Sequence, residues 1–466
     1  MGFKDILLNL PEIKGPLQKR LSFKQKLKWT GLILVLYFLL GLIPLYGLGV
    51  NALQQFEQLS IILGASFGSL ISLGIGPLVT SSIVLQLLNG SGILKFDLTT
   101  PDGKRKFQGV QKMLSIFFIV FEGAIYVYMG GLAPSASLAP AQYRIMQLIL
   151  IGQIIVGGLL IMYMDEVVNK WGFGSGISLF IAAGVSAEIM IRAFSPLTTA
   201  GTLAFGTLQP PIGKVWVFFQ SLLGRNPVGA ALALSSIVAT VVVFALSVYG
   251  QAMKVEIPLS FGRVRGHGIR WPLNFIYTSN IPVILVAALM ANMQLWARLL
   301  QNWGHPILGT FSGNMPATGL VAWLNHPNIV EGIITGSFRL MDLAHAGVYL
   351  LIMILGAVVF SYFWVQTSGM DARSQARQIM SSGLQIPGFR RDERILEHIL
   401  KRYITPLTIL GGALVGFLAA SADLLGALSR GTGILLAVMI IYKFYEEIAK
   451  QHMMDMHPSL RKFMGK

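Results

Sequence analysis

Ten long apolar runs dominate this 466-residue chain and leave few folds open to it. A helix needs about 20 apolar residues to cross the hydrocarbon of a bilayer. The runs are continuously apolar rather than alternating, which favours membrane-spanning helices over a closed barrel. With 54% hydrophobic and 12% charged residues, the chain is not an ordinary soluble domain. We predict spans near residues 28–46, 69–89, 108–130, 143–164, 175–192, 230–252, 274–296, 342–365, 404–422 and 430–448.

The basic residues follow a topological pattern. The chain has 36 Lys and Arg against 20 Asp and Glu, and 29 of the basic residues fall in the N-terminus, every second loop and the C-terminal tail. By the positive-inside rule, these segments and both termini are cytoplasmic. The long basic loops are 250–273 and 366–402. Docking of a polyanion such as RNA is a second explanation for this charge, but charge alone favours simple orientation.

Two halves of the chain carry related breaks in the same order. The second and seventh spans contain Gly74-Ile75-Gly76-Pro77 and Asn280-Ile281-Pro282, and the fifth and tenth open with Gly174-Ser175-Gly176-Ile177 and Gly431-Thr432-Gly433-Ile434. Five spans per half require the halves to be inverted, as in transport proteins with a pathway between repeats. Chance is the competing explanation, because membrane helices tolerate Gly and Pro. We favour the repeat.

The segment 56–68 is apolar but too short to cross a bilayer. It is either an external apolar helix or a short helix that folds back into the protein, and the residues alone do not separate the two. Ser22 and Gln25 have the spacing of a capping box at the start of the first span.

Glu122 is the ionisable residue that falls near the middle of a span. Such a carboxylate is a functional candidate, with Gln86, Asn292 and Gln294 as polar partners, or else it joins helices as a neutral hydrogen-bonding group. The chain has no cysteine and its seven histidines are scattered, so we expect no cofactor, no metal and no enzymatic activity. A secondary transporter would also explain inverted halves, but it requires convergent polar residues at the midplane.

Six stretches spread along the chain resemble the SecY family, the central subunits of protein-conducting channels, and are most similar to its archaeal members. They are residues 26–31, 73–80, 172–177, 255–258, 279–284 and 430–434. The resemblance implies an all-α integral membrane protein with ten transmembrane helices in two inverted five-helix halves around an hourglass pore. The function it implies is passage of unfolded secretory polypeptides, and release of transmembrane segments sideways into lipid.

The resemblance also implies roles for particular residues. The pore constriction would be a ring of Ile75, Val79, Ile177, Ile181, Ile284 and Leu436. A plug closing the external funnel would be formed by Gln58, Leu59, Ser60, Ile61, Ile62, Leu63, Gly64, Ala65, Ser66 and Phe67. A polar cluster at the lateral gate would be Ser72, Thr80, Glu122 and Asn292, and ribosome docking would involve Arg263, Arg265, Arg390 and Arg391.

The partners implied are a SecE-type subunit, a small beta subunit, the ribosome or another motor, signal sequences, nascent polypeptides and membrane lipid. The expected location is the plasma membrane. We divide the chain into an interfacial segment, the N-terminal half, an external loop, the C-terminal half and a cytoplasmic tail, at residues 1–27, 28–200, 201–229, 230–450 and 451–466.

Overall fold

The computed structural model describes most of the chain. The described residues are 11–17, 21–49, 68–90, 92–94, 96, 101–128, 132–135, 137–198, 202–204, 209–261, 268–278, 281–302, 304–312, 315–381, 384–385 and 392–456. The predicted plug, 58–67, and the four predicted docking arginines lie outside these residues.

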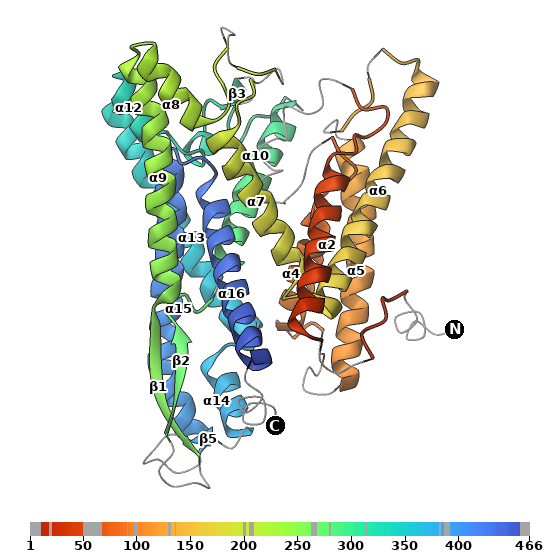
Figure 1. Ribbon diagram of the computed structural model, residues 1–466, viewed down its shortest axis with the longest axis vertical. Helices are drawn as coiled ribbons and strands as arrows, with labels where there is room; N and C mark the ends of the chain where they lie inside the picture. The colour runs from red at the N-terminus through yellow and green to blue at the C-terminus, as the bar shows by residue number, and fades with distance from the viewer. Residues whose placement is uncertain are drawn as a thin grey trace. The chain divides into compact units, whose positions relative to one another are not determined.

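Each of the ten predicted spans coincides with a helix, which confirms the fold class (Figure 1). Six helices among the described residues are long and apolar enough to cross a membrane on their own. Many apolar side chains on these helices are exposed, as on the outer face of α9 at Val241 and Phe244. The ten helices are α2 Phe23–Gly41, α4 Gly76–Gly90, α5 Pro101–Tyr128, α6 Pro140–Trp171, α7 Gly176–Phe194, α9 Pro227–Ala252, α10 Ile281–Asn302, α13 Leu340–Thr367, α15 Glu393–Leu424 and α16 Gly431–Met456.

The helix boundaries differ from the predicted spans where local chemistry intervenes. The first helix starts with the predicted capping box, in which the side chains of Ser22 and Gln25 bond to each other's backbone N–H. The second predicted span is helical only from Gly76, because residues 69–75 form successive tight turns. The seventh begins at Ile281, since residues 268–274 belong to a strand.

Four shorter helices occupy connections among the described residues. They are α8 Lys214–Leu223 between α7 and α9, α11 Leu320–Trp323 and α12 Ile329–Thr335 between α10 and α13, and α14 Ala372–Ser381 in the basic loop 366–402.

The basic loop 250–273 contains strands that the sequence analysis did not predict. An antiparallel sheet has the order β2-β1-β5, formed by β1 Lys254–Phe261, β2 Gly268–Asn274 and β5 Leu384–Gln385. Ile257 pairs with Trp271, and Ile257 and Leu273 are buried in one cluster with α14 and α15. A second pair, β3 Phe311–Ser312 and β4 Met315–Pro316, lies between α10 and α13.

The chain forms two compact units. Unit 1 comprises residues 1–186 and 440–466, and unit 2 comprises residues 187–439. In unit 1, α5 packs against α4 and α6, and α2 packs against α6. In unit 2, α13 packs against α10 and α15, around a core that includes Met353, Ala357 and Val415.

Candidate pore and gate residues

The predicted ring residues occupy the first turns of helices. Ile75 directly precedes α4 and Val79 lies one turn later, where its N–H donates to the Ile75 carbonyl oxygen at 3.0 Å. Ile177 and Ile181 lie one turn apart on α7. In unit 1, Ile75 and Ile181 are buried, whereas Val79 and Ile177 are partly exposed. Each pair therefore presents two aliphatic side chains from neighbouring positions on one helix face.

The other two predicted ring residues belong to unit 2. Ile284 lies in the first turn of α10 and is partly exposed. Leu436 lies in the second turn of α16 and is buried. All six predicted ring residues are thus close to the start of a helix that follows a break in the sequence.

The break before α4 is buried non-helical backbone. Ser69, Ile71 and Leu73 are each less than 5% exposed. Gly74 adopts φ +55°, a conformation that L side chains rarely adopt, and its N–H donates to the Ile71 carbonyl oxygen at 2.8 Å. The backbone here is packed closely, since a Cβ on Gly157 of α6 would lie 1.7 Å from the Leu70 oxygen. The turns satisfy their own polar groups, as irregular backbone at membrane depth requires.

Part of the predicted gate cluster comes together in unit 1. The Glu122 carboxyl on α5 shares a hydrogen bond with the Thr80 side chain on α4. The buried Ser72 hydroxyl donates to the Ser69 carbonyl oxygen at 2.5 Å, within the preceding turn. The side chain of Asn292 lies outside the described residues.

A second polar link between α4 and α5 was not predicted. The hydroxyls of Ser81 and Ser115 are 2.6 Å apart and buried, and each also lies within hydrogen-bond distance of a carbonyl oxygen of its own helix. One hydroxyl therefore donates to the other, which donates to its own helix. The sequence does not predict this contact, because a serine hydroxyl in an apolar helix can bond to a carbonyl oxygen of its own helix whether or not a second helix lies beside it.

Two aspartates at span ends fix the starts of α7 and α16. Asp165, near the end of α6, accepts a hydrogen bond from the Ile177 N–H at 2.8 Å and another from Gly176. Asp423, at the end of α15, accepts from the Gly431 N–H at 2.7 Å. The sequence analysis did not predict either contact.

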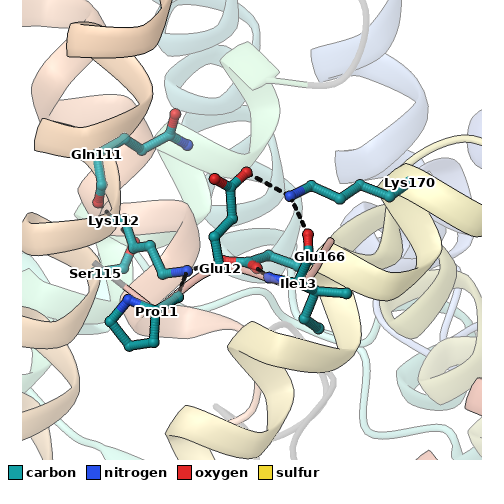
Figure 2. Close-up of polar contacts among 8 residues, drawn as sticks. All are labelled: Pro11, Glu12, Ile13, Gln111, Lys112, Ser115, Glu166 and Lys170. Carbon is teal, nitrogen blue, oxygen red and sulfur yellow. Dashed lines mark hydrogen bonds and ion pairs between the residues drawn. The ribbon is translucent and has the colours of Figure 1, made fainter. Parts of the chain in front are cut away.

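The N-terminal segment contacts α5 at Lys112 and the last turns of α6 (Figure 2). Lys170 forms an ion pair with Glu12 and donates to the Ile13 carbonyl oxygen at 2.6 Å. The Ile13 N–H donates to Glu166 at 3.0 Å, and Glu166 pairs with Lys112. We call residues 11–14 the strap. The hydrogen bond from Lys170 lowers the pKa of Glu12 below its ordinary value.

A cavity of about 460 Å³ lies beside the strap within unit 1. Charged side chains of both signs line it, including Arg105, Lys112 and Asp165. Its apolar lining includes Leu78 and the predicted ring residue Ile177. The start of α7 therefore borders a polar, accessible space.

The two basic loops meet in the sheet of unit 2. Ser260 and Phe261, the last residues of β1, pair with Gln385 and Leu384 of β5. The described ends of both loops therefore lie side by side. Arg270 of β2 pairs with Glu256 of β1 at 3.0 Å, and both side chains are more than half exposed. Within the part of the chain that is described, no group of three or more His, Asp or Glu residues could hold a metal ion.

Comparison with known proteins gives a consistent result over nearly the whole chain. The SecY family model matches residues 69–445, and the model of the plug domain of Sec61p matches residues 35–68. Protein translocase subunit SecY of Methanothermobacter thermautotrophicus is 47% identical, with 99% of this chain and 98% of the relative covered. The SecY subunit of Methanocaldococcus jannaschii is 42% identical, with 99% of each chain covered.

Solved structures agree with these sequence relatives. A structure described as a protein-conducting channel matches with a TM-score of 0.79 and 41% identity, covering 98% of this chain and 99% of that one. Sec61 in a canine ribosome-channel complex matches with a TM-score of 0.77 and 40% identity, with the same coverage. The chain belongs to the SecY family, and its segment 35–68 carries the plug domain.

Proposed function

We propose that this chain passes unfolded secretory polypeptides through an hourglass pore and releases transmembrane segments sideways into lipid. Family membership makes it a channel subunit of a protein translocase rather than an enzyme. The observation that carries the proposal is full-length similarity to protein-conducting channels, at 41% identity. A bound ribosome or another motor is proposed to drive the passage.

The pore constriction is proposed to be the ring of Ile75, Val79, Ile177, Ile181, Ile284 and Leu436. A narrow apolar opening blocks ions by dewetting, yet its aliphatic side chains can move apart around a polypeptide without binding it. The position of these residues near helix starts supports the proposal, since hydrogen bonds to Asp165 and Asp423 fix the starts of α7 and α16.

Replacement of Ile75 and Ile284 by Gly or Asn tests the ring. The double variant should make reconstituted channels leak ions, because the apolar seal is lost. A matched exchange at Val241, which is exposed on α9, should leave the conductance unchanged. Equal conductance of the ring variant and the wild type would contradict the proposal.

The lateral gate is proposed to include Ser72, Thr80, Glu122 and Asn292. The hydrogen bond between Thr80 and Glu122 supports the part of this cluster that lies in unit 1. A polar seam of this kind can hold a gate shut until an apolar segment replaces it. Glu122→Leu should ease insertion of a weakly apolar transmembrane segment, measured as the fraction integrated. An unchanged fraction would leave Glu122 as a contact within unit 1 only.

The plug is proposed to be residues 58–67, inside the stretch that matches the plug-domain model. The chain has no cysteine, so single introduced cysteines give a clean test. A pair such as Ser60→Cys with Ile75→Cys should crosslink in resting membranes. Failure at every plug position would contradict the re-entrant arrangement.

The ribosome is proposed to dock on the basic loops through Arg263, Arg265, Arg390 and Arg391. The pairing of β1 with β5 supports this, because it joins the two loops at their described ends. Charge reversal at Arg390 and Arg391 should weaken ribosome binding, most strongly at low salt. Unaltered binding would leave these residues as signals of orientation.

The protein is a membrane protein, and we propose the plasma membrane with both termini in the cytoplasm. The alternation of basic segments supports this orientation. A SecE-type subunit and a small beta subunit are proposed partners. Copurification of two small single-span proteins with the tagged chain would support them, and a chain that purifies alone from mild detergent would not.

A further inference from the structure

The turn between α15 and α16 is bound by neighbouring helices of unit 2. The Leu428 N–H donates to the Thr240 hydroxyl of α9 at 2.8 Å. The Ser429 hydroxyl donates to Glu188 of α7 at 2.9 Å, and Arg192 donates to the Leu428 carbonyl oxygen at 3.2 Å. The turn is therefore fixed from two sides before α16 begins.

Asp423 connects this turn to a third helix. One carboxyl oxygen accepts from the Gly431 N–H at 2.7 Å, and the other accepts from the Tyr349 hydroxyl of α13 at 2.7 Å. The Asp423 side chain is 7% exposed. Hydrogen bonds to a carboxylate in such surroundings are short and directional, so each one restrains the group that donates it.

The first residue of α16 has no freedom to move toward α15. A Cβ on Gly431 would lie 2.0 Å from the Ala419 carbonyl oxygen and 2.7 Å from the Ala422 Cβ. Backbone thus contacts backbone on one side, while Asp423 holds the N–H on the other. The carboxylate also lies at the helix end where the backbone dipole favours a negative charge.

Leu436, a proposed ring residue, lies five residues after Gly431 on the same helix. A helix is stiff over this length, so a rotation or shift at its first residue reaches the ring. We propose that Asp423 is a positioning residue of the channel, which sets the place of α16 and thereby keeps Leu436 in the seal. This inference rests on the proposed ring.

A simple stabilising role is the alternative, in which Asp423 adds to the free energy of unfolding and does nothing for the seal. A cavity of about 40 Å³ adjoins Asp423 and is lined also by Gln294, His326 and Arg430. That volume admits water, so truncation of the side chain leaves the freed donors with a hydration site. Asp423→Ala should therefore fold, with the start of α16 less restrained.

The test compares five variants of the full-length protein in liposomes, one of which, Leu436→Gly, tests the proposed ring itself. Asp423→Ala should raise the resting ion flux at least roughly tenfold, because the loss of even one bond to a charged group shifts the ratio of displaced to native helix by about that factor. Asp423→Asn should restore a low flux, since its amide oxygen still accepts from Gly431. Tyr349→Phe should give a smaller rise. The control Thr408→Ala removes a buried hydroxyl of α15 that bonds only within its own helix, to the Ile404 oxygen, and should not leak.

A second readout follows the helix itself. Spin labels at the exposed positions Leu355 of α13 and Ile441 of α16 report their distance distribution. Asp423→Ala should broaden this distribution and Asp423→Asn should restore it. If Asp423→Ala does not fold, the ion flux and the distance distribution of Tyr349→Phe test the positioning role instead.

The outcomes separate the inference from the proposed ring. If Leu436→Gly leaks while Asp423→Ala neither leaks nor broadens the distribution, the positioning role is wrong and the ring stands. If Leu436→Gly does not leak, the ring is wrong at that position, and an unchanged distance distribution in Asp423→Ala would also overturn the restraint on α16.

Discussion

The starts of α7 in unit 1 and α16 in unit 2 use the same device in different surroundings. In each, an aspartate at the end of the preceding helix accepts a backbone N–H from the first turn, at 2.8 Å for Asp165 and 2.7 Å for Asp423. Asp423 is 7% exposed and is shared with α13, whereas Asp165 borders a cavity of about 460 Å³. The cavity beside Asp423 is only about 40 Å³, so less water competes for the contact and it should carry more free energy in unit 2.

The glycines provide the largest expected difference between the two starts. A Cβ on Gly431 would lie 2.0 Å from a backbone oxygen of α15, while on Gly176 the nearest atom, the Asp165 Cα, would be 2.6 Å away. We expect Gly431→Ala to destabilise the protein by about 3 kcal/mol or more and Gly176→Ala by about 1–3 kcal/mol. Thermal unfolding of the purified variants measures both. A control is Gly347→Ala, which meets no atom within 4 Å.

The aspartates should give the next largest difference. Asp423→Ala removes two bonds to a buried carboxylate, and we expect a loss of about 3 kcal/mol. Asp165→Ala leaves donors that water in the adjoining cavity can reach, and we expect about 1 kcal/mol. Both values come from thermal unfolding in the same detergent. Equal losses would mean that the surroundings of the two carboxylates do not change how much each contributes to the free energy of unfolding.

Much of this architecture could be predicted from apolar run length. The ten helices were predicted, because a membrane span must satisfy its backbone hydrogen bonds within the helix and therefore appears in the sequence as a long apolar run. The repeated glycine motifs also located the starts of α7 and α16. Their physical reason, the close approach of Gly431 to Ala419, depends on a neighbouring helix and is not readable along the chain.

The strands and the side-chain partners were not predictable in the same way. Residues 254–257 alternate in polarity, which is typical of a strand, but Pro258 and Pro272 argue against a central strand. The strand is identified only by its pairing with β2, a contact that the local pattern does not show. Likewise Asp423 reads as a residue at a span end until Tyr349, 74 positions away, is brought beside it. Contacts at such separations are set by helix packing rather than by local pattern.

The second partners of the two aspartates should differ by less. Tyr349→Phe leaves a buried carboxyl oxygen without its donor, and we expect a loss of about 1–2 kcal/mol. Asn169, which bonds to Asp165 from the same helix, lines the cavity, so Asn169→Ala should cost less than about 0.5 kcal/mol. Thermal unfolding again decides. A larger loss for Asn169→Ala would contradict the view that water substitutes for partners in unit 1.

Loss of the ion pair in the strap should have the smallest effect on stability, because this ion pair is exposed to water. It should also show the clearest dependence on pH. Lys170 lowers the pKa of Glu12 from the ordinary 4.5, so the stabilisation is present above pH 4.5 and is lost as the pH falls through the lowered value. The Glu12 side chain is 64% exposed, which keeps the effect small. A spin label at Leu17, in an otherwise cysteine-free chain, should become more mobile only as the pH falls through the lowered pKa of Glu12, below 4.5. In Glu12→Gln the label should be partly mobile at every pH, because the bonds to Ile13 remain. A label as immobile as in the wild type would show that the ion pair does not help to hold the strap.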